Sequence, residues 1–159
     1  GVHATIVGGH PAEPDLGRVR ALAADPAVTD RVAFPGMVPP AAVAARLRAA
    51  HVLALPNSAT AISSAYTSPL KLFEYLAAGR AIVASDLPAF REIIGEDEAM
   101  LVPPDDAPAL AAALARLRDD EALRQRLGRT AFALAGRYTW AARAERLDAL
   151  FRTVTGPAR

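Results

Sequence analysis

The sequence contains no cysteine, and this absence excludes three kinds of chemistry. Without thiols the chain can form no disulfide scaffold, no thiolate zinc site and no cysteine nucleophile. Its three histidines, His3, His10 and His51, are scattered and lack the H-E-x-x-H spacing of zinc hydrolases. We therefore expect no metal site in this chain.

Long hydrophobic runs and an excess of one charge are also missing. No apolar run approaches the ~20 residues of a membrane helix, and no signal peptide opens the sequence. The formal net charge of +1 gives no electrostatic reason to expect binding to nucleic acid or to an anionic membrane. These absences predict a cytoplasmic protein that has no transmembrane segment and binds no nucleic acid.

Short apolar runs alternate with helical stretches over about residues 1–104. The runs are continuous and rich in β-branched residues, which is typical of parallel strands buried on both faces. Strand–helix alternation of this kind indicates βαβ units. The expected strands cover residues 2–7, 31–34, 51–55, 81–84 and 99–102. Helices are expected at 16–24, with Asp15 as N-cap, and at 41–50 and 88–94. The prediction is an α/β fold, a three-layer Rossmann-like parallel sheet flanked by helices.

The sequence becomes helical throughout at about residues 105–155. Leucines at helical spacing mark three stripes, and the stripes break near residues 119–120 and 136–137. We expect a C-terminal extension of three helices, with Asp105 and Asp106 as an N-cap pair and Trp140 in the core. Residues 1–159 are expected to form a single domain. Because the chain starts almost directly with a strand, we expect it to be a fragment of a two-domain enzyme.

One helix has clear signals at both ends. Ser68 suits its N-cap, Pro69 suits its first position and Gly79 suits its C-terminal end. The free amides of Leu70 and Lys71, together with the Lys71 ammonium group, would attract a phosphate. Since ligands of open α/β sheets bind beyond the carboxyl ends of the strands, this helix start predicts a diphosphate site.

Glu74 lies one turn further along the same helix. Its neighbours are mostly apolar, so we expect the helix to be buried and the carboxylate to need a partner. One partner would be the ribose hydroxyls of a nucleotide. The other would be Lys71, three residues away on the same face. The spacing alone does not choose between a ligand and this ion pair.

Three blocks of sequence carry recognisable motifs: residues 34–38 (FPGMV), 50–56 (AHVLALP) and 68–88 (SPLKLFEYLAAGRAIVASDLP). Together they resemble the group 1 (family four) GT-B glycosyltransferases. The first block resembles the family's F-x-G-x-V turn, and the second its A-D-V-x-x-x-P strand. The third looks like the family's signature block. Their order and gaps also match, from about residue 2 to residue 104.

The resemblance implies a C-terminal, donor-binding domain of a metal-independent enzyme that uses no other cofactor. Its substrate would be a nucleoside-diphosphate sugar, and its partner the N-terminal acceptor domain of the same enzyme. Glu74 corresponds to the second glutamate of the family's E-x7-E motif, which binds the ribose. Gly36, Met37 and Val38 would border the base. The turn formed by Ser68, Pro69, Leu70 and Lys71 would border the diphosphate and the sugar.

Two departures from the family pattern affect activity. Tyr66 stands where the motif has its first glutamate, and a phenol cannot replace a carboxylate that binds a sugar hydroxyl. The family's basic pair, an arginine and a lysine, has no match in this sequence. No residue is a convincing general base or nucleophile. We therefore expect this chain alone to transfer no sugar.

Two other functions remain open. A non-catalytic nucleotide-binding module would be consistent with Tyr66. A sugar-nucleotide epimerase shares the GT-B architecture.

Some polar residues lie outside the motifs. Asn57 and Ser58 lie in a loop that could touch the donor. Arg91 and Glu92 suit a solvated face, and His51 suits a structural role.

Overall fold

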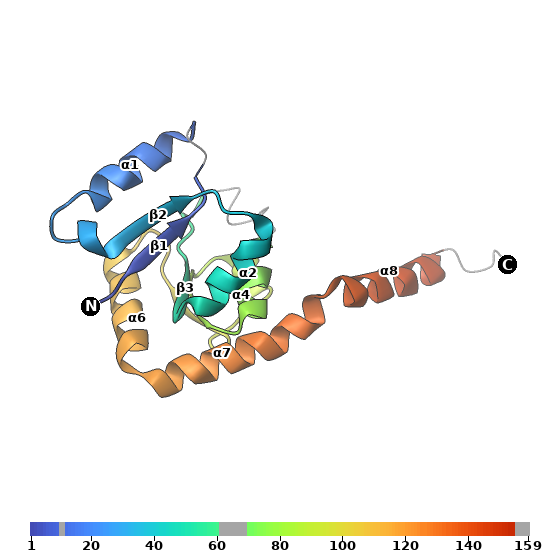
Figure 1. Ribbon diagram of the computed structural model, residues 1–159. Coiled ribbons are helices and arrows are strands. Elements are labelled where there is room, and N and C mark those ends of the chain that lie inside the picture. Colours follow the sequence, from blue (N-terminus) through green and yellow to red (C-terminus); the bar gives the residue numbers. More distant parts are fainter. Residues whose placement is uncertain (10–11, 61–69, 155–159) are drawn as a thin grey trace. The chain divides into compact units, whose positions relative to one another are not determined.

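The computed structural model describes residues 1–9, 12–60 and 70–154. The chain divides into two compact units, Gly1–Arg46 and Leu47–Arg159. Their helices and strands are drawn in Figure 1. Parallel sheets with helices between their strands confirm the predicted α/β class.

The first unit contains one parallel strand pair joined by a helical crossover. β1 (Ala4–Val7) pairs with β2 (Val32–Gly36), and between them lie α1 (Pro14–Ala23) and the 3₁₀ turn η1 (Thr29–Arg31). Parallel strands need such a crossover because a tight turn can join only antiparallel neighbours. Helix α2 (Pro40–Ala49) follows β2.

The N-cap predicted for the first helix was wrong. Glu13 occupies the cap position, without a side-chain cap bond, and Asp15 lies in the first turn of α1. The reason is Pro14, whose fixed φ suits the first helical position and so starts the helix two residues earlier. Asp15 still favours the helix there, because a negative charge near the N-terminus interacts well with the helix dipole.

The second unit contains a three-stranded parallel sheet in the order β3–β4–β5. Its strands are β3 (Val52–Leu55), β4 (Ala81–Ser85) and β5 (Ala99–Val102). Helix α4 (Leu70–Ala78) lies between β3 and β4 in the sequence, and α5 (Pro88–Arg91) lies between β4 and β5. Pairing runs without a bulge, with Val52 opposite Ala81 and Ile82 opposite Ala99.

Strand β4 divides the core of this unit into two layers. All five of its residues are buried, and alternate side chains join different clusters. Ile82 and Ala84 pack with Leu72 and Leu76 of α4 and with Phe90 of α5. On the other face, the cluster contains Ala81, Val83, Val102, Ala113, Leu117 and Leu127. Since side chains of a strand point alternately to its two faces, helices on both sides produce a three-layer arrangement.

The prediction that the strands are buried on both faces was wrong for β1, which is exposed at all four positions. β4 has a strand on either side and helices over both faces. Within its own unit, β1 has one neighbouring strand and a single crossover helix, which cannot cover both faces. The apolar run therefore predicted the strand correctly but not how far its side chains are buried.

The C-terminal helices break where the sequence predicted. They are α6 (Ala107–Asp119), α7 (Glu121–Ala135) and α8 (Trp140–Val154), and the 3₁₀ turn η2 (Gly136–Tyr138) precedes α8. Among the described helices, none combines the length and the hydrophobicity needed to cross a bilayer. Trp140 was expected in the core, but it is 83% exposed. No residue of α8 is buried, because this helix extends beyond the sheet and the helices that cover it (Figure 1).

Candidate functional site

The carboxyl ends of β3, β4 and β5 meet at one edge of the second unit's sheet. Ligands of parallel sheets bind beyond such an edge. A small cavity of about 180 Å³ lies there. It is lined by Pro56, Ser85, Val102, Pro103, Asp105, Asp106, Ala107 and Leu110. Its volume is below the ~300 Å³ at which small-molecule pockets begin, so this cavity has room for a small part of a ligand.

Helix α4 begins on the chain segment that leaves this edge after β3. Its first described residue is Leu70, which is 71% exposed, and Lys71 is exposed beside it. Three predicted site residues, Tyr66, Ser68 and Pro69, lie outside the described residues. The first turn of any α-helix has backbone N–H groups without a partner inside the helix. Lys71 is the only lysine in the sequence, and it stands in this turn.

The expectation that α4 is buried all round was wrong. The helix buries Leu72 and Leu76, whereas Lys71 and Glu74 are exposed. Residues four apart lie on the same face of a helix, so the buried pair and the exposed residues form two opposite stripes. The carboxylate of Glu74 therefore faces solvent and has room for a ligand.

The described residues do not contain the ion pair that was the alternative predicted for Glu74. Lys71 and Glu74 form no ion pair with each other within the described part of the chain. Tyr75, next to Glu74, contacts β3 through its hydroxyl, which donates to the carbonyl of Ala54 at 3.4 Å. Burial, and then the nearby Glu74 carboxylate, raise the pKa of this phenol, which keeps it protonated as a donor.

A ring contact and a capping turn define the middle and the end of α4. The ring centroid of Phe73 lies 5.1 Å from that of Tyr138 in a tilted arrangement. The helix ends at Gly79, as predicted, with φ of 66° and its N–H donating to the carbonyl of Leu76 at 3.1 Å. The exposed stripe that carries Lys71 and Glu74 is thus fixed by a buried stripe and by both neighbours of Glu74.

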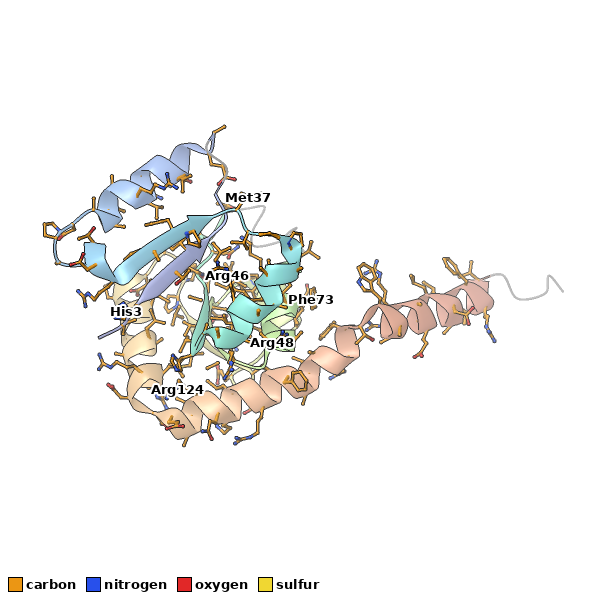
Figure 2. The ribbon with its side chains drawn as sticks, viewed as in Figure 1. His3, Met37, Arg46, Arg48, Phe73 and Arg124 are labelled. Atoms are coloured by element: carbon orange, nitrogen blue, oxygen red, sulfur yellow. The ribbon has the colours of Figure 1, made fainter. Side chains whose placement is uncertain are left out.

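The other predicted contact residues, Gly36, Met37 and Val38, belong to the first unit. Gly36 ends β2 with φ of 72°, a left-handed conformation that favours glycine. Its carbonyl accepts the N–H of Gly8 at 2.9 Å, so the ends of β1 and β2 are tied together. Met37 is 74% exposed (Figure 2), and Val38 is half-buried. The turn therefore presents an exposed apolar side chain that could border a base.

Sequence reasoning missed an ion pair directly after β4. Arg91 is exposed, as predicted, and its guanidinium donates to both carboxylate oxygens of Asp86, at 2.6 and 2.9 Å. It also reaches Glu96 at 3.4 Å. The hydrogen bonds from Arg91 lower the pKa of Asp86. This pair closes the turn from β4 into α5. A bidentate guanidinium–carboxylate pair fixes geometry more tightly than a single contact does.

Asp105 and Asp106 play different parts. Asp106 is the N-cap of α6, as predicted, and accepts the N–H of Ala109 at 2.8 Å. Asp105 does not cap the helix and instead accepts the N–H of Ala59 at 3.0 Å. Residues 46 positions apart in the sequence form this contact, so no local pattern could have indicated it.

A larger cavity, of about 520 Å³, lies at the amino ends of β3 and β4. It is lined by His51, Gly79, Arg80, Ala81, Glu121, Arg124, Gln125, Gly128, Arg129, Phe132 and Ala133. One of its cations, Arg124 (Figure 2), is engaged, since it donates to the carbonyls of Leu117 and Arg118 at the end of α6. Because ligands of parallel sheets bind at the opposite edge, this cavity is not the candidate site for the donor.

Metal ligands do not gather in the described residues, where no group of three or more histidine, aspartate or glutamate side chains could hold an ion. The candidate site is therefore built from helix amides, one ammonium group and one carboxylate.

Comparison with known proteins gives one family. A family model described as glycosyl transferases group 1 matches residues 1–120. The phosphatidyl-myo-inositol mannosyltransferase of Mycolicibacterium smegmatis is 36% identical over 124 residues, which cover 77% of this chain and 31% of that protein. The curated relatives that match are much longer, and the chain spans about a third of their length.

Solved structures agree with this assignment. Sucrose-phosphate synthase from Thermosynechococcus elongatus is 28% identical, with a TM-score of 0.79 over 97% of this chain and 39% of that one. Anabaena HepE in complex with UDP and glucose is 17% identical, with a TM-score of 0.83 over 96% of this chain and 41% of that one. These neighbours have the GT-B fold, which confirms the predicted fold class.

Proposed function

Since this chain belongs to the group 1 glycosyltransferases, we propose that it binds the nucleoside-diphosphate sugar donor of an enzyme that glycosylates an acceptor hydroxyl. In this reaction the bond between the anomeric carbon and the diphosphate breaks. The acceptor oxygen gives up its proton and bonds to that carbon, and the nucleoside diphosphate leaves.

The observation that supports this proposal is the exposed stripe of α4. Lys71 lies in the first turn of α4, which follows β3 in the chain, and Glu74 lies one turn further along the same stripe. The first-turn amides and Lys71 would bind the diphosphate, and Glu74 would accept hydrogen bonds from the ribose. Amides and a cation that already point at the diphosphate stabilise the charge that grows on it as the sugar leaves.

The relatives are much longer than this chain, which suggests that a second domain takes part in the reaction. Because the chain spans about a third of the relatives it matches, we propose that a separate acceptor-binding domain completes the enzyme. No metal or other cofactor enters this proposal. Two related proteins support the donor class, since one is a mannosyltransferase and one solved neighbour holds UDP and glucose. We expect the 159-residue chain by itself to transfer no sugar. Measurable transfer would contradict the proposal that a separate acceptor-binding domain is needed.

The test is a titration of UDP, GDP and ADP sugars against the whole protein, followed by thermal shift and calorimetry. A ligand that binds the native state raises its apparent stability by mass action. Loss of hydrogen bonds to a charged group costs about 1.5–3 kcal/mol, so Glu74→Ala should weaken binding by about tenfold or more. Glu92→Ala is the matched control, because Glu92 is an exposed glutamate of the same unit outside α4.

Two outcomes would end the proposal. One is the absence of any stabilisation by the three nucleotide sugars. The other is an unchanged dissociation constant in the Glu74→Ala protein, which would show that this carboxylate does not contact the donor.

A further inference from the structure

Asp105 has an unusual backbone conformation. Among the described residues it is the only non-glycine with a positive φ, at 59°. Residues other than glycine rarely adopt this left-handed backbone conformation, although aspartate and asparagine do so more readily than most. The residue lies in the short turn between β5 and α6, directly after Pro103 and Pro104. Something in the folded chain must favour this conformation.

The side chain of Asp105 supplies a reason. Its carboxylate accepts the backbone N–H of Ala59 at 3.0 Å and also a hydrogen bond from the Ser58 side chain. Both donors lie in the segment 56–60, which directly follows β3. The hydrogen bond from Ser58, and then that from Ala59, lower the pKa of Asp105, so the carboxylate is charged at neutral pH.

The location of this contact relates it to the candidate site. Pro56 and Asp105 line the same 180 Å³ cavity at the carboxyl ends of the strands. The segment 56–60 is the first part of the connection from β3 to α4. Asp106 is committed to capping α6, so Asp105 is the carboxylate of this turn that is available to bind the segment.

We infer that Asp105 is a positioning residue, which holds residues 56–60 against the turn after β5 and thereby fixes the start of the donor-binding connection. This inference rests on the proposed function. A segment that is already ordered loses less conformational entropy when a ligand binds, so the donor binds more tightly. Asn57, half-buried within this segment, would be presented to the donor in one arrangement.

The test compares four variants of the whole protein. Asp105→Ala removes the acceptor. Asp105→Gly removes it while easing the backbone conformation, and Asp105→Asn retains an acceptor oxygen in a residue that tolerates positive φ. Asp106→Asn is the matched control, since asparagine caps helices as well as aspartate does and the same charge is lost from the same turn.

Amide hydrogen exchange of residues 57–60 and the dissociation constant of the nucleotide sugar are both measured. A net hydrogen bond corresponds to about a two- to tenfold change, so we expect Asp105→Ala and Asp105→Gly to speed exchange at Ala59 by that factor. Donor binding should weaken by a similar factor, with exchange in β4 unchanged. Asp105→Asn should recover part of both effects, and Asp106→Asn should leave both near the original values.

Each contrary result has a distinct meaning. Unchanged exchange at Ala59 in Asp105→Ala would show that the carboxylate does not hold the segment, and would overturn the inference. Faster exchange with an unchanged dissociation constant would show a structural contact without a role in donor binding, and would overturn it as well. If the unmodified protein binds no nucleotide sugar, the proposed function fails, and the exchange data still decide whether Asp105 holds the segment.

Discussion

Helix α7 passes so close to the end of α4 that Gly128 contacts the backbone of Gly79. A Cβ atom added at Gly128 would lie 2.6 Å from the carbonyl oxygen of Gly79 and 3.2 Å from its carbonyl carbon. Real Cβ atoms do not approach a backbone oxygen so closely. The crossing of α7 over the turn between α4 and β4 therefore requires glycine at position 128.

Gly128→Ala should destabilise the protein despite improving the helix propensity of α7. Alanine gains about 1 kcal/mol over glycine inside a helix. The clash is with backbone, which cannot move aside, and overpacking of this kind costs about 1–3 kcal/mol. We expect a net loss of unfolding free energy in urea titrations. Gly136→Ala is the control, because nothing lies within 4 Å of its added Cβ and its backbone is helical. A Gly128→Ala protein as stable as Gly136→Ala would show that α7 does not cross in this way.

The pair of Asp86 and Arg91 should make stability depend on pH. Its hydrogen bonds lower the pKa of Asp86 from the ordinary 3.8, so the folded state binds this proton less readily than the unfolded state. The stabilisation is therefore present above about pH 4 and is lost as pH falls through the lowered value. Asp86→Asn should lower the urea midpoint at pH 7 and have less effect at pH 3.

The effect at Asp86 should be modest, because both partners are 41% exposed. Asp97→Asn serves as the control, since Asp97 is 86% exposed and lies 3.7 Å from Arg126. Equal effects of the two variants at both pH values would contradict a specific contribution from the pair after β4.

Lys71 should affect donor binding through its charge. Lys71→Ala should raise the dissociation constant of a nucleoside diphosphate by about tenfold, as expected for a lost hydrogen bond to a charged group. The salt dependence of binding should become weaker, because one cation fewer faces the diphosphate. Arg80→Ala is the matched control, since Arg80 is an exposed cation just past the other end of α4, whose nine residues span ~13 Å at 1.5 Å per residue. Equal losses in both variants would point to general charge rather than to a site at the helix start.

Trp140 should report its exposure by fluorescence. It is the only tryptophan in the sequence and is 83% exposed, so the 159-residue chain should show the red-shifted emission of an indole in water. Acrylamide should quench it efficiently. A blue-shifted, protected emission would mean that α8 packs its first turn against another surface. Phe132→Ala is a suitable control, because it removes an exposed aromatic residue of α7 without changing the reporter.

The sequence by itself determined the order and approximate ends of nearly every described element. Local rules suffice for this: Gly79 ends α4, Asp106 caps α6, and leucines at helical spacing mark three helices that break near residues 120 and 136. The family resemblance likewise needed only the blocks around residues 34–38, 50–56 and 68–88. These features depend on neighbours within a few positions, which a sequence displays directly.

Tertiary structure alone decided what each side chain faces. Glu74 and Trp140 are exposed, although apolar neighbours and aromatic character suggested burial. Asp105 binds a segment 46 positions away, while Asp106 beside it behaves as the local pattern predicts. Exposure and long-range hydrogen bonds depend on which elements pack together, and that information is distributed over residues far apart in the chain. A local pattern therefore specifies a helix or a strand, whereas only packing specifies the contacts and the depth of its residues.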